Sequence, residues 1–531
     1  MRDPKERKLF ASLLGGKMLG VALCLVVMYG VSAYIDSTSK AHAQDAPATA
    51  QVTPAAPAAA APAAAAEPAA AAAPAPAAAD AAPATPPPNP PYVNPINTMW
   101  VLIAAFLVFF MQAGFMFLEA GFSRTRECVN VMLEGIVDTS LCGVLFYCWG
   151  FAWMFGHGNG WIGHGDAAGK SWYFLQNLPD TYEGTGVATL AIFLFQFAFA
   201  DTCSTITSGA MVGRTGFWGD LWYSLGVSGF IYPILGHWAW GPDGWLLAIP
   251  FWKAAAFHDF AGSTVVHTIG GMIALAGAIV LGPRLGRKFV RDGGGPMPGH
   301  NMLIAAVGAI ILWFGWYGFN PGSTLSAMDI QGIARVSANT TLAACTGGLA
   351  ALFFVYPRYK KWDCGMTLNG LLAGLVAITC PCYWVSPLGA MIIGVVAGIL
   401  VVLGTDLLEY MRIDDPCGAW PVHGLCGIWG TLSLGFFATG QFGAPTPTGA
   451  DNSAAAIVKG LFYGGGTDQL VAQLIGNAAI GGAAFIVALI LMYAVKATGT
   501  LRVSADGETE GLDIHEHGAE AYPEMGRGAR S

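Results

Sequence analysis

Charge is the scarcest property of this sequence. Asp, Glu, Lys and Arg make up 11% of its 531 residues, whereas soluble domains carry about 25%. Hydrophobic residues reach 54%, and no basic patch is present that could attract nucleic acid. This composition excludes an ordinary soluble domain. We therefore predict an all-α polytopic membrane protein, embedded in the lipid bilayer.

Metal-binding cysteine patterns are also absent. The chain has 11 cysteines but no C-x-x-C pair, and Cys380-Pro-Cys382 is too short to chelate a metal alone. Most of the cysteines lie inside apolar segments, where they act as small packing residues. We accordingly predict neither a metal site nor a cofactor.

The first 43 residues have the pattern of a secretory signal. Met1–Lys8 is charged, Met18–Val31 is apolar, and Ala41-His42-Ala43 offers an A-x-A cleavage site. A cleaved signal peptide over 1–43 is favoured, and an uncleaved anchor helix is the alternative. Residues 44–96 are rich in Ala and Pro, which favours a disordered segment outside the cytoplasm.

Eleven apolar segments follow, and we expect each of them to form a transmembrane helix. They cover residues 97–122, 130–156, 185–212, 217–240, 261–283, 300–320, 333–357, 365–382, 386–409, 418–440 and 468–496. With the N-terminus outside, the membrane domain over 97–496 leaves the tail, 497–531, in the cytoplasm. The predicted inner loops hold eleven Lys and Arg residues and the outer loops four, as the positive-inside rule requires. This predicts a multi-pass protein of the inner (cytoplasmic) membrane.

Two of these segments carry one motif, D-x-x-G-x-x-x-V-H, at Asp259–His267 and Asp415–His423. At about 1.5 Å per residue, each histidine lies about 12 Å along a helix, near the middle of a slab about 30 Å thick. Five crossings separate the copies, so they run in opposite directions. This is typical of an inverted repeat, here five plus five helices with a C-terminal helix added. We predict that His267 and His423 meet, although either alone is explained equally well as a satisfied core histidine.

Aromatic residues gather in Phe195–Phe199, His237–Trp240 and Trp313–Phe319. Aromatic faces attract small cations by about 0.5–2 kcal/mol each. Between these clusters the predicted passage holds two neutral imidazoles and little else that ionises, which favours a cation that can release its proton, such as ammonium. Three other tryptophans are assigned to an interfacial aromatic belt: Trp172, Trp245 and Trp252.

The motifs resemble those of the ammonium transporter (Amt/Mep/Rh) family, on its Amt branch. They are DFAGSTVVH at 259–267, GWYGFNPGS at 315–323, DDPCGAWPVHGLCG at 414–427 and LRVSADGETEGLDIHEHG at 501–518. The resemblance extends over about residues 97–522. It implies ammonium or ammonia transport for nitrogen uptake rather than enzymatic activity. It also implies a homotrimer with one pore per subunit and a PII-type signalling protein as cytoplasmic partner.

The same resemblance implies an outer site and a gate. Trp240, Phe199 and Ser323 correspond to the external recruitment site, where aromatic faces and a hydroxyl meet ammonium. Phe199 and Phe319 correspond to the stacked pair that closes the pore from outside, with Phe195 beside it.

The resemblance further implies a pore and two structural carboxylates. Four side chains are expected to line the pore: His267, His423, Trp316 and Thr379. Asp259 corresponds to a buried carboxylate needed for conduction, and Asp415, its repeat partner, is expected to cap its own helix.

Two stretches depart from the family pattern, and two other functions stay open. Gly241–His258 is longer and more aromatic than expected, and Arg124–Cys128 replaces the usual R-x-K-N of the first inner loop. One alternative function is an ammonium sensor that signals through the tail. The other is a redox membrane enzyme with His267 and His423 as axial haem ligands.

Overall fold

The computed structural model describes residues 89–523. The predicted signal peptide and nearly all of the Ala/Pro-rich segment lie outside these residues. Within the described part, helices dominate, which confirms the helical class. The strands form three two-stranded hairpins: β1 (His157–Gly158) with β2 (Gly163–Gly165), β3 (Thr181–Tyr182) with β4 (Val187–Ala188), and β5 (Ala444–Thr446) with β6 (Gly449–Asp451).

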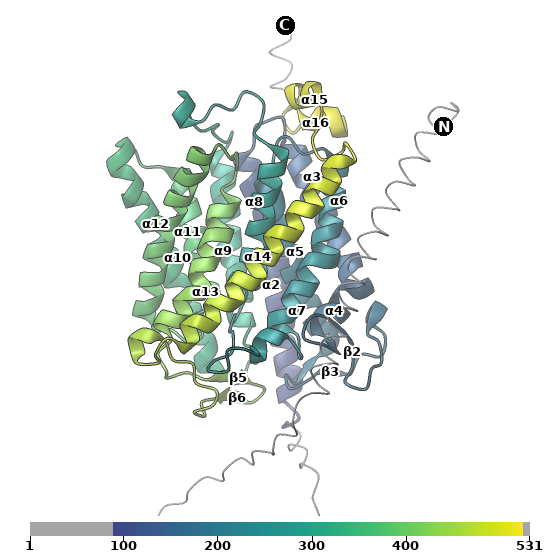
Figure 1. Ribbon diagram of the computed structural model, residues 1–531, viewed down its shortest axis with the longest axis vertical. Coiled ribbons are helices and arrows are strands. Elements are labelled where there is room, and N and C mark those ends of the chain that lie inside the picture. The colour runs from purple at the N-terminus through teal and green to yellow at the C-terminus, as the bar shows by residue number, and fades with distance from the viewer. Residues whose placement is uncertain (1–88, 524–531) are drawn as a thin grey trace, which may run out of the picture. The chain divides into compact units, whose positions relative to one another are not determined.

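Helices occupy every predicted apolar segment, and their ends fall within four residues of the predicted bounds. In chain order they are α2 (Val93–Phe122), α3 (Cys128–Leu145) with η1 (Phe146–Gly150) and α4 (Phe151–Phe155), α5 (Thr189–Gly209), α6 (Phe217–Gly226) with η3 (Val227–Ile231) and α7 (Tyr232–Trp240), η5 (Ser263–Thr268) with α8 (Ile269–Leu281), α9 (Met302–Gly322), α10 (Ile330–Tyr359), α11 (Cys364–Thr379), α12 (Pro387–Met411), η7 (Trp420–Leu425) with α13 (Cys426–Phe437), and α14 (Asp468–Ala497). Figure 1 shows them side by side. Because α2 already begins at Val93, whose side chain is buried, the prediction of disorder is wrong for residues 93–96.

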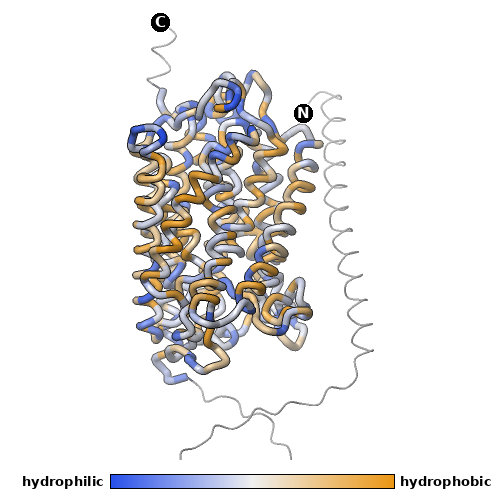
Figure 2. Tube along the Cα trace, turned by 60° about the vertical axis from the view of Figure 1, so that its left-hand side comes forward, coloured by the Kyte–Doolittle hydropathy of each residue, from blue (hydrophilic) through white to orange (hydrophobic). Residues whose placement is uncertain are grey.

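Eight helices in the described range are long and apolar enough to cross a membrane. They begin at Val93, Cys128, Thr189, Ser263, Met302, Ile330, Pro387 and Asp468. Hydrophobic residues fill a broad band between two more hydrophilic ends (Figure 2), as a bilayer requires. The remaining predicted crossings correspond to α6–η3–α7, α11 and η7–α13, so eleven crossings and a five-plus-five repeat stay predictions.

Four of the helical segments contain a π turn, namely η1, η3, η5 and η7. A π turn inserts one extra residue into a helix, and such turns occur frequently at functional sites. Both predicted histidines lie within one, His267 in η5 and His423 in η7. The two copies of the motif therefore share a local backbone irregularity as well as a sequence.

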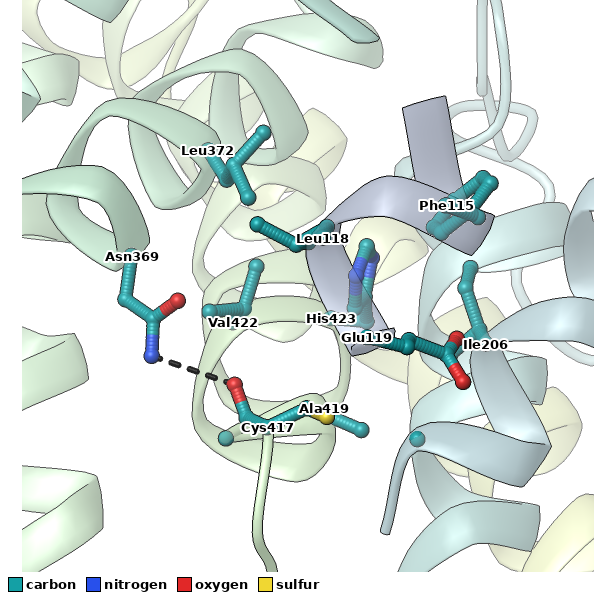
Figure 3. Close-up of a pocket in the computed structure, with 12 residues that line it drawn as sticks. Phe115, Leu118, Glu119, Ile206, Asn369, Leu372, Cys417, Ala419, Val422 and His423 are labelled. Carbon is teal, nitrogen blue, oxygen red and sulfur yellow. Dashed lines mark hydrogen bonds between the residues drawn. The ribbon is translucent and has the colours of Figure 1, made fainter. Parts of the chain in front are cut away.

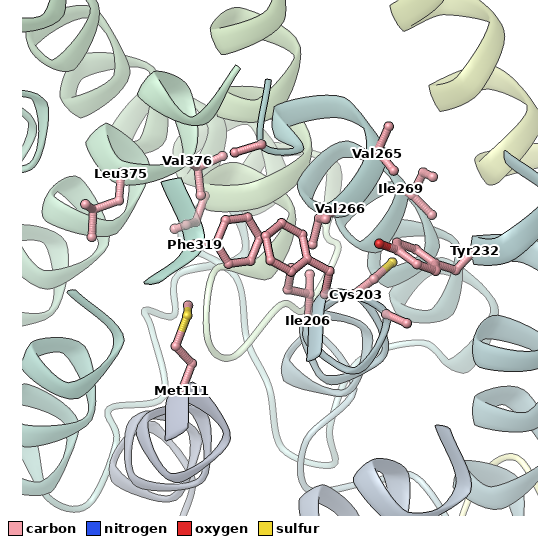
Figure 4. Close-up of a cluster of buried hydrophobic side chains, with 14 of the residues drawn as sticks. Met111, Cys203, Ile206, Tyr232, Val265, Val266, Ile269, Phe319, Leu375 and Val376 are labelled. Carbon is pink, nitrogen blue, oxygen red and sulfur yellow. The ribbon is translucent and has the colours of Figure 1, made fainter. Parts of the chain in front are cut away.

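The core lies where the two histidine helices cross. A Cβ atom added to Gly271 of α8 would lie 2.1 Å from the backbone nitrogen of Gly424, so the two backbones are in direct contact there. Figure 4 shows buried apolar side chains of the core, including Met111 of α2, Ile206 of α5 and Phe319 of α9. Packing of this density holds the imidazoles in place.

The tail folds back onto the helix ends. Its helices α15 (Ala505–Glu510) and α16 (Leu512–His517) contact the loop between α2 and α3, where Arg126 Nη1 donates to the Thr509 carbonyl at 2.7 Å. Asp513 Oδ1 accepts from the Asn130 backbone N–H at 2.9 Å, at the start of α3. The departure from R-x-K-N at Arg124–Cys128 thus lies in a tail-binding loop.

Candidate functional site

The two predicted histidines contact each other. His267 Nδ1 and His423 Nδ1 lie 3.2 Å apart, and the ring centroids are 5.2 Å apart with an interplanar angle of 29°. Both side chains are buried, at 0% and 6% exposure. A hydrogen bond between two Nδ1 atoms requires one ring to carry its proton there and the other to be bare, so the pair shares a single Nδ1 proton.

Each histidine helix begins with a carboxylate cap of the same design. Asp259 accepts four backbone N–H groups, from Gly262 to Val265, at 2.8–3.0 Å. Asp415 accepts three, from Gly418 to Trp420, at 2.9–3.0 Å. The glycine three residues after each Asp has a positive φ, 113° and 74°, which a side chain would strain. The caps orient both imidazoles, and Asp259 is a structural element rather than a ligand in this arrangement.

Above the imidazoles lies a group of stacked phenyl rings. The Phe199 and Phe319 centroids are 3.9 Å apart at 21°, and Phe195 packs against Phe199 with centroids 4.6 Å apart. His267 stacks on Phe319 at 5.4 Å. All three phenylalanines are almost fully buried, so the stack closes off the side of His267 on which Phe319 lies.

The outer side of this stack meets the predicted recruitment residues. Trp240 contacts Phe199 with ring centroids 6.1 Å apart, and its Nε1 donates to the Asp259 carbonyl at 2.7 Å. That bond links the outer tryptophan to the cap of the His267 helix. Ser323 Oγ donates to the Phe319 carbonyl at 2.8 Å, so its oxygen keeps lone pairs for another donor.

Trp316 and Thr379 complete the wall around the pair. The indole of Trp316 stacks on His267 with centroids 5.2 Å apart, and its Nε1 donates to Thr379 Oγ1 at 2.9 Å. Thr379 in turn donates to the Leu375 carbonyl of its own helix. The structure therefore brings together all the predicted pore, gate and recruitment residues in one column.

On the tail side of His423 lies a small cavity (Figure 3). Phe115 and Glu119 of α2 line it, together with Asn369 of α11 and Cys417. Glu119 Oε2 accepts from Ser208 Oγ at 3.1 Å. Sequence reasoning missed Glu119, although a signal was present: it is the sole ionisable residue of the apolar segment 97–122.

The arrangement of the described His, Cys, Asp and Glu side chains argues against metal and haem binding. Within residues 89–523, no group of three or more His, Cys, Asp or Glu side chains is arranged to hold a metal ion. The rings of His267 and His423 touch directly, whereas axial haem ligands lie on opposite sides of an iron. The residues present do not fit the haem alternative.

The comparison with known sequences decides the family. Residues 99–522 match the Ammonium Transporter Family. The chain belongs to the Ammonium Transporter Family. It is 44% identical over 434 residues to ammonium transporter Amt2 of Archaeoglobus fulgidus, covering 81% of this chain and 88% of that protein. It is also 37% identical over 445 residues to ammonium transporter 1 member 3 of Solanum lycopersicum, covering 80% and 93%.

Solved structures of the Ammonium Transporter Family agree with the fold. A structure named Sensor Amt Protein aligns with a TM-score of 0.69 at 35% identity, covering 80% of this chain and 99% of that one. Mep2 of Saccharomyces cerevisiae also aligns with a TM-score of 0.69, at 27% identity, covering 77% and 89%.

Proposed function

We propose that this protein carries ammonium across the cytoplasmic membrane by passing ammonia through the column of residues described above. The observation that carries the proposal is the buried His267–His423 pair, which lies directly beneath the Phe199–Phe319 stack. Names of the similar proteins supply the substrate: Amt2 and member 3 are ammonium transporters. A transporter needs no bond-making chemistry, and we propose no enzymatic activity.

In the proposed mechanism, ammonium first binds at Trp240, Phe199 and Ser323. The aromatic faces attract the cation by about 0.5–2 kcal/mol each, and the free lone pairs of Ser323 Oγ accept an N–H. This is too little to offset the loss of its hydration shell in the apolar column. Ammonium therefore releases its proton to water at the Phe199–Phe319 gate, with Phe195 beside it, and neutral ammonia goes on.

The histidine pair then offers ammonia one donor and one acceptor. Because a single proton bridges the Nδ1 atoms, one ring carries N–H at Nε2 and the other a bare Nε2. His267 Nε2 is buried and has no hydrogen-bond partner within residues 89–523. Trp316 and Thr379 hold this ring in place, and Asp259 and Asp415 hold the two helices.

The proposal includes topology and partners. We place the N-terminus outside and the C-terminus in the cytoplasm, because Lys and Arg gather in the loops on the tail side. We further propose eleven crossings with the five-plus-five repeat, a homotrimer, and a cytoplasmic face that can bind a PII-type protein.

Transport in liposomes tests this function. Purified protein, an imposed ammonium gradient, and simultaneous recording of charge and internal pH separate an electrogenic carrier from a gas channel. Replacement of either histidine (H267E or H423E) should change ammonium uptake or admit potassium, because a carboxylate in the column favours bare cations. Unchanged currents and uptake in both variants would remove the proposed role of the pair.

A sensor role is the second candidate. One similar structure is named Sensor Amt Protein, and the tail of this chain binds the first inner loop through Arg126 and Asn130. The described part of the chain ends soon after α16, without a further folded domain in residues 89–523. Growth of a transporter-deficient cell on low ammonium would favour transport, while ligand binding without growth rescue would favour sensing.

A further inference from the structure

A row of carboxyl groups lies between α3, α5 and α6, apart from the column of pore residues. We call it the acidic seam and define it by Glu134 and Asp138 of α3, Asp201 of α5, and Asp220 and Ser224 of α6. All five side chains are at most 3% exposed. The α3 and α6 members are spaced by four residues, so each pair lies along one helix face.

The acidic seam has no compensating positive charge. Among residues 89–523, none of its four carboxyl groups forms an ion pair with Lys, Arg or His. Asp138 of α3 and Asp220 of α6 lie close enough for their charges to repel. Two neighbouring carboxylates repel each other, and unpaired charges at this depth cost several kcal/mol each. At least one proton must therefore reside in the acidic seam.

Polar atoms in the acidic seam lack partners within the described residues. Both oxygens of Asp138, both of Asp201 and Oδ2 of Asp220 make no hydrogen bond of normal geometry. The hydroxyl of Ser224, which is fully buried and faces Asp138, is likewise unpaired. Orphaned polar atoms are rare in folded proteins, and a group of them in one place indicates that they bind protons and water.

The acidic seam runs from the depth of the gate to the tail. Asp201 follows Phe199 by two residues, about 3 Å along α5. At the other end, Glu134 Oε1 accepts from Asn130 Nδ2 at 2.9 Å. Asn130 also contacts Asp513, through its backbone N–H, and His517 of the tail, through Oδ1 at 2.9 Å.

We propose that the acidic seam is a proton-binding site of the transport cycle, which accepts the proton that ammonium releases and exchanges it with the cytoplasm beside the tail. This inference rests on the proposed function. One N–H bond of ammonium breaks, its electron pair stays on nitrogen, and the proton adds to a carboxylate oxygen through bound water. The proton later leaves that oxygen for water at Asn130. Ammonia thus travels alone past His267 and His423.

The test uses the full-length protein in liposomes, with the double variant D138N/D220N. Asparagine is neutral and of similar size, so the helices should still pack if the carboxyls are protonated. We expect the ammonium-driven charge movement to fall by at least about tenfold. The infrared carbonyl band of protonated carboxyl groups should weaken in the same samples, a signal that does not depend on transport.

D406N is the matched control. Asp406 is an exposed aspartate of α12 that pairs with Arg358, and its loss should leave both signals within about twofold of wild type. An unchanged current and an unchanged carboxyl band in D138N/D220N would overturn the inference. A second result would also overturn it: if sodium or potassium stabilised the wild type but not the double variant, the acidic seam would be a binding site for a metal cation. Absence of any ammonium flux in the wild type would instead refute the proposed function, and the infrared measurement would still test the acidic seam.

Discussion

In the proposed repeat, the interface between α3 and α6 is the counterpart of the interface between α10 and α12 (Figure 1 shows the four helices). The first contains the acidic seam. The second is closed by small residues: a Cβ on Gly398 would lie 2.2 Å from the Gly347 carbonyl oxygen, and one on Gly394 2.4 Å from that of Ala343. The α3–α6 interface encloses carboxyl groups, whereas the α10–α12 interface brings two backbones into contact.

This difference separates the features that both halves of the proposed repeat share from those found in one half. The histidine helices keep their Asp cap, positive-φ glycine, π turn and imidazole in both halves. The α3–α6 and α10–α12 interfaces share no such set of matching residues. The proposed transport route uses both copies of the histidine motif, whereas the proposed proton-binding site lies in one half only.

Replacement of the glycine at the close contact should have the largest effect. G398V places a branched side chain against the α10 backbone, which cannot shift without separating the helices, so we expect a loss above about 3 kcal/mol and no folded protein in detergent. Size-exclusion profiles measure this. G482A of α14 is the control, because a Cβ there has no neighbour within 4 Å. A monodisperse G398V would show that the two interfaces are equally tolerant.

The next largest effect should follow from removal of a carboxylate cap, and it should differ between Asp259 and Asp415. D259A leaves four buried N–H groups without an acceptor and should lower the free energy of unfolding by about 2–4 kcal/mol. D415A leaves three and should cost less. Thermal unfolding followed by tryptophan fluorescence compares them. Equal losses would mean that the two halves depend on their caps to the same degree.

A smaller effect is expected where the repeats differ by one hydroxyl. Ser263 occupies the position of Ala419, and its Oγ donates to the Val376 carbonyl at 2.8 Å and accepts from Cys380 N at 2.7 Å. S263A should cost about 1–2 kcal/mol, because the Cys380 N–H is left unpaired. S433A is the control, since Ser433 bonds only within its own helix. Should both variants melt at the wild-type temperature, the hydroxyl does not join the halves.

The smallest effect concerns pH at the outer ends. The pKa of His157 is raised by its hydrogen bond to Glu183, against partial burial, and by Asp243. His237 also lies near Asp243. The imidazolium therefore stabilises the folded state fully below about pH 6.5, and this stability is lost as pH rises through the higher folded pKa.

In the other half, Arg335 packs on Tyr383 and Phe442 and stays charged over this range. The melting temperature of the wild type should thus fall slightly between about pH 6 and pH 8, and H157Q should flatten that slope. An equal slope in H157Q would place the titrating group elsewhere.

Much of the fold and of the site could be predicted from the sequence. Apolar runs located the helices to within four residues, because hydrocarbon leaves few ways to pair a backbone. The repeated D-x-x-G-x-x-x-V-H motif predicted that His267 and His423 meet, and they do.

Other features depend on packing that no local pattern encodes. Trp172, expected in the interfacial belt, is 1% exposed and lies 6.1 Å from Phe151, because the outer loop folds over it. The outer stretch Gly241–His258 inserts Leu246 into the core in the same way. Glu134 and Asp138 were visible as acids in an apolar run, but the alignment of α3 with α6 was not.

The π turns of η5 and η7 have a consequence for how this chain can vary in length. Residues 263–266 of η5 separate the Asp259 cap from His267, and removal of one of them would rotate His267 by about 100° relative to the cap. His267 would then point away from His423. An insertion or deletion in residues 263–266 should therefore disrupt the histidine pair even where the side chains themselves are kept. An evolving or engineered variant must therefore preserve the number of residues between the Asp cap and the histidine.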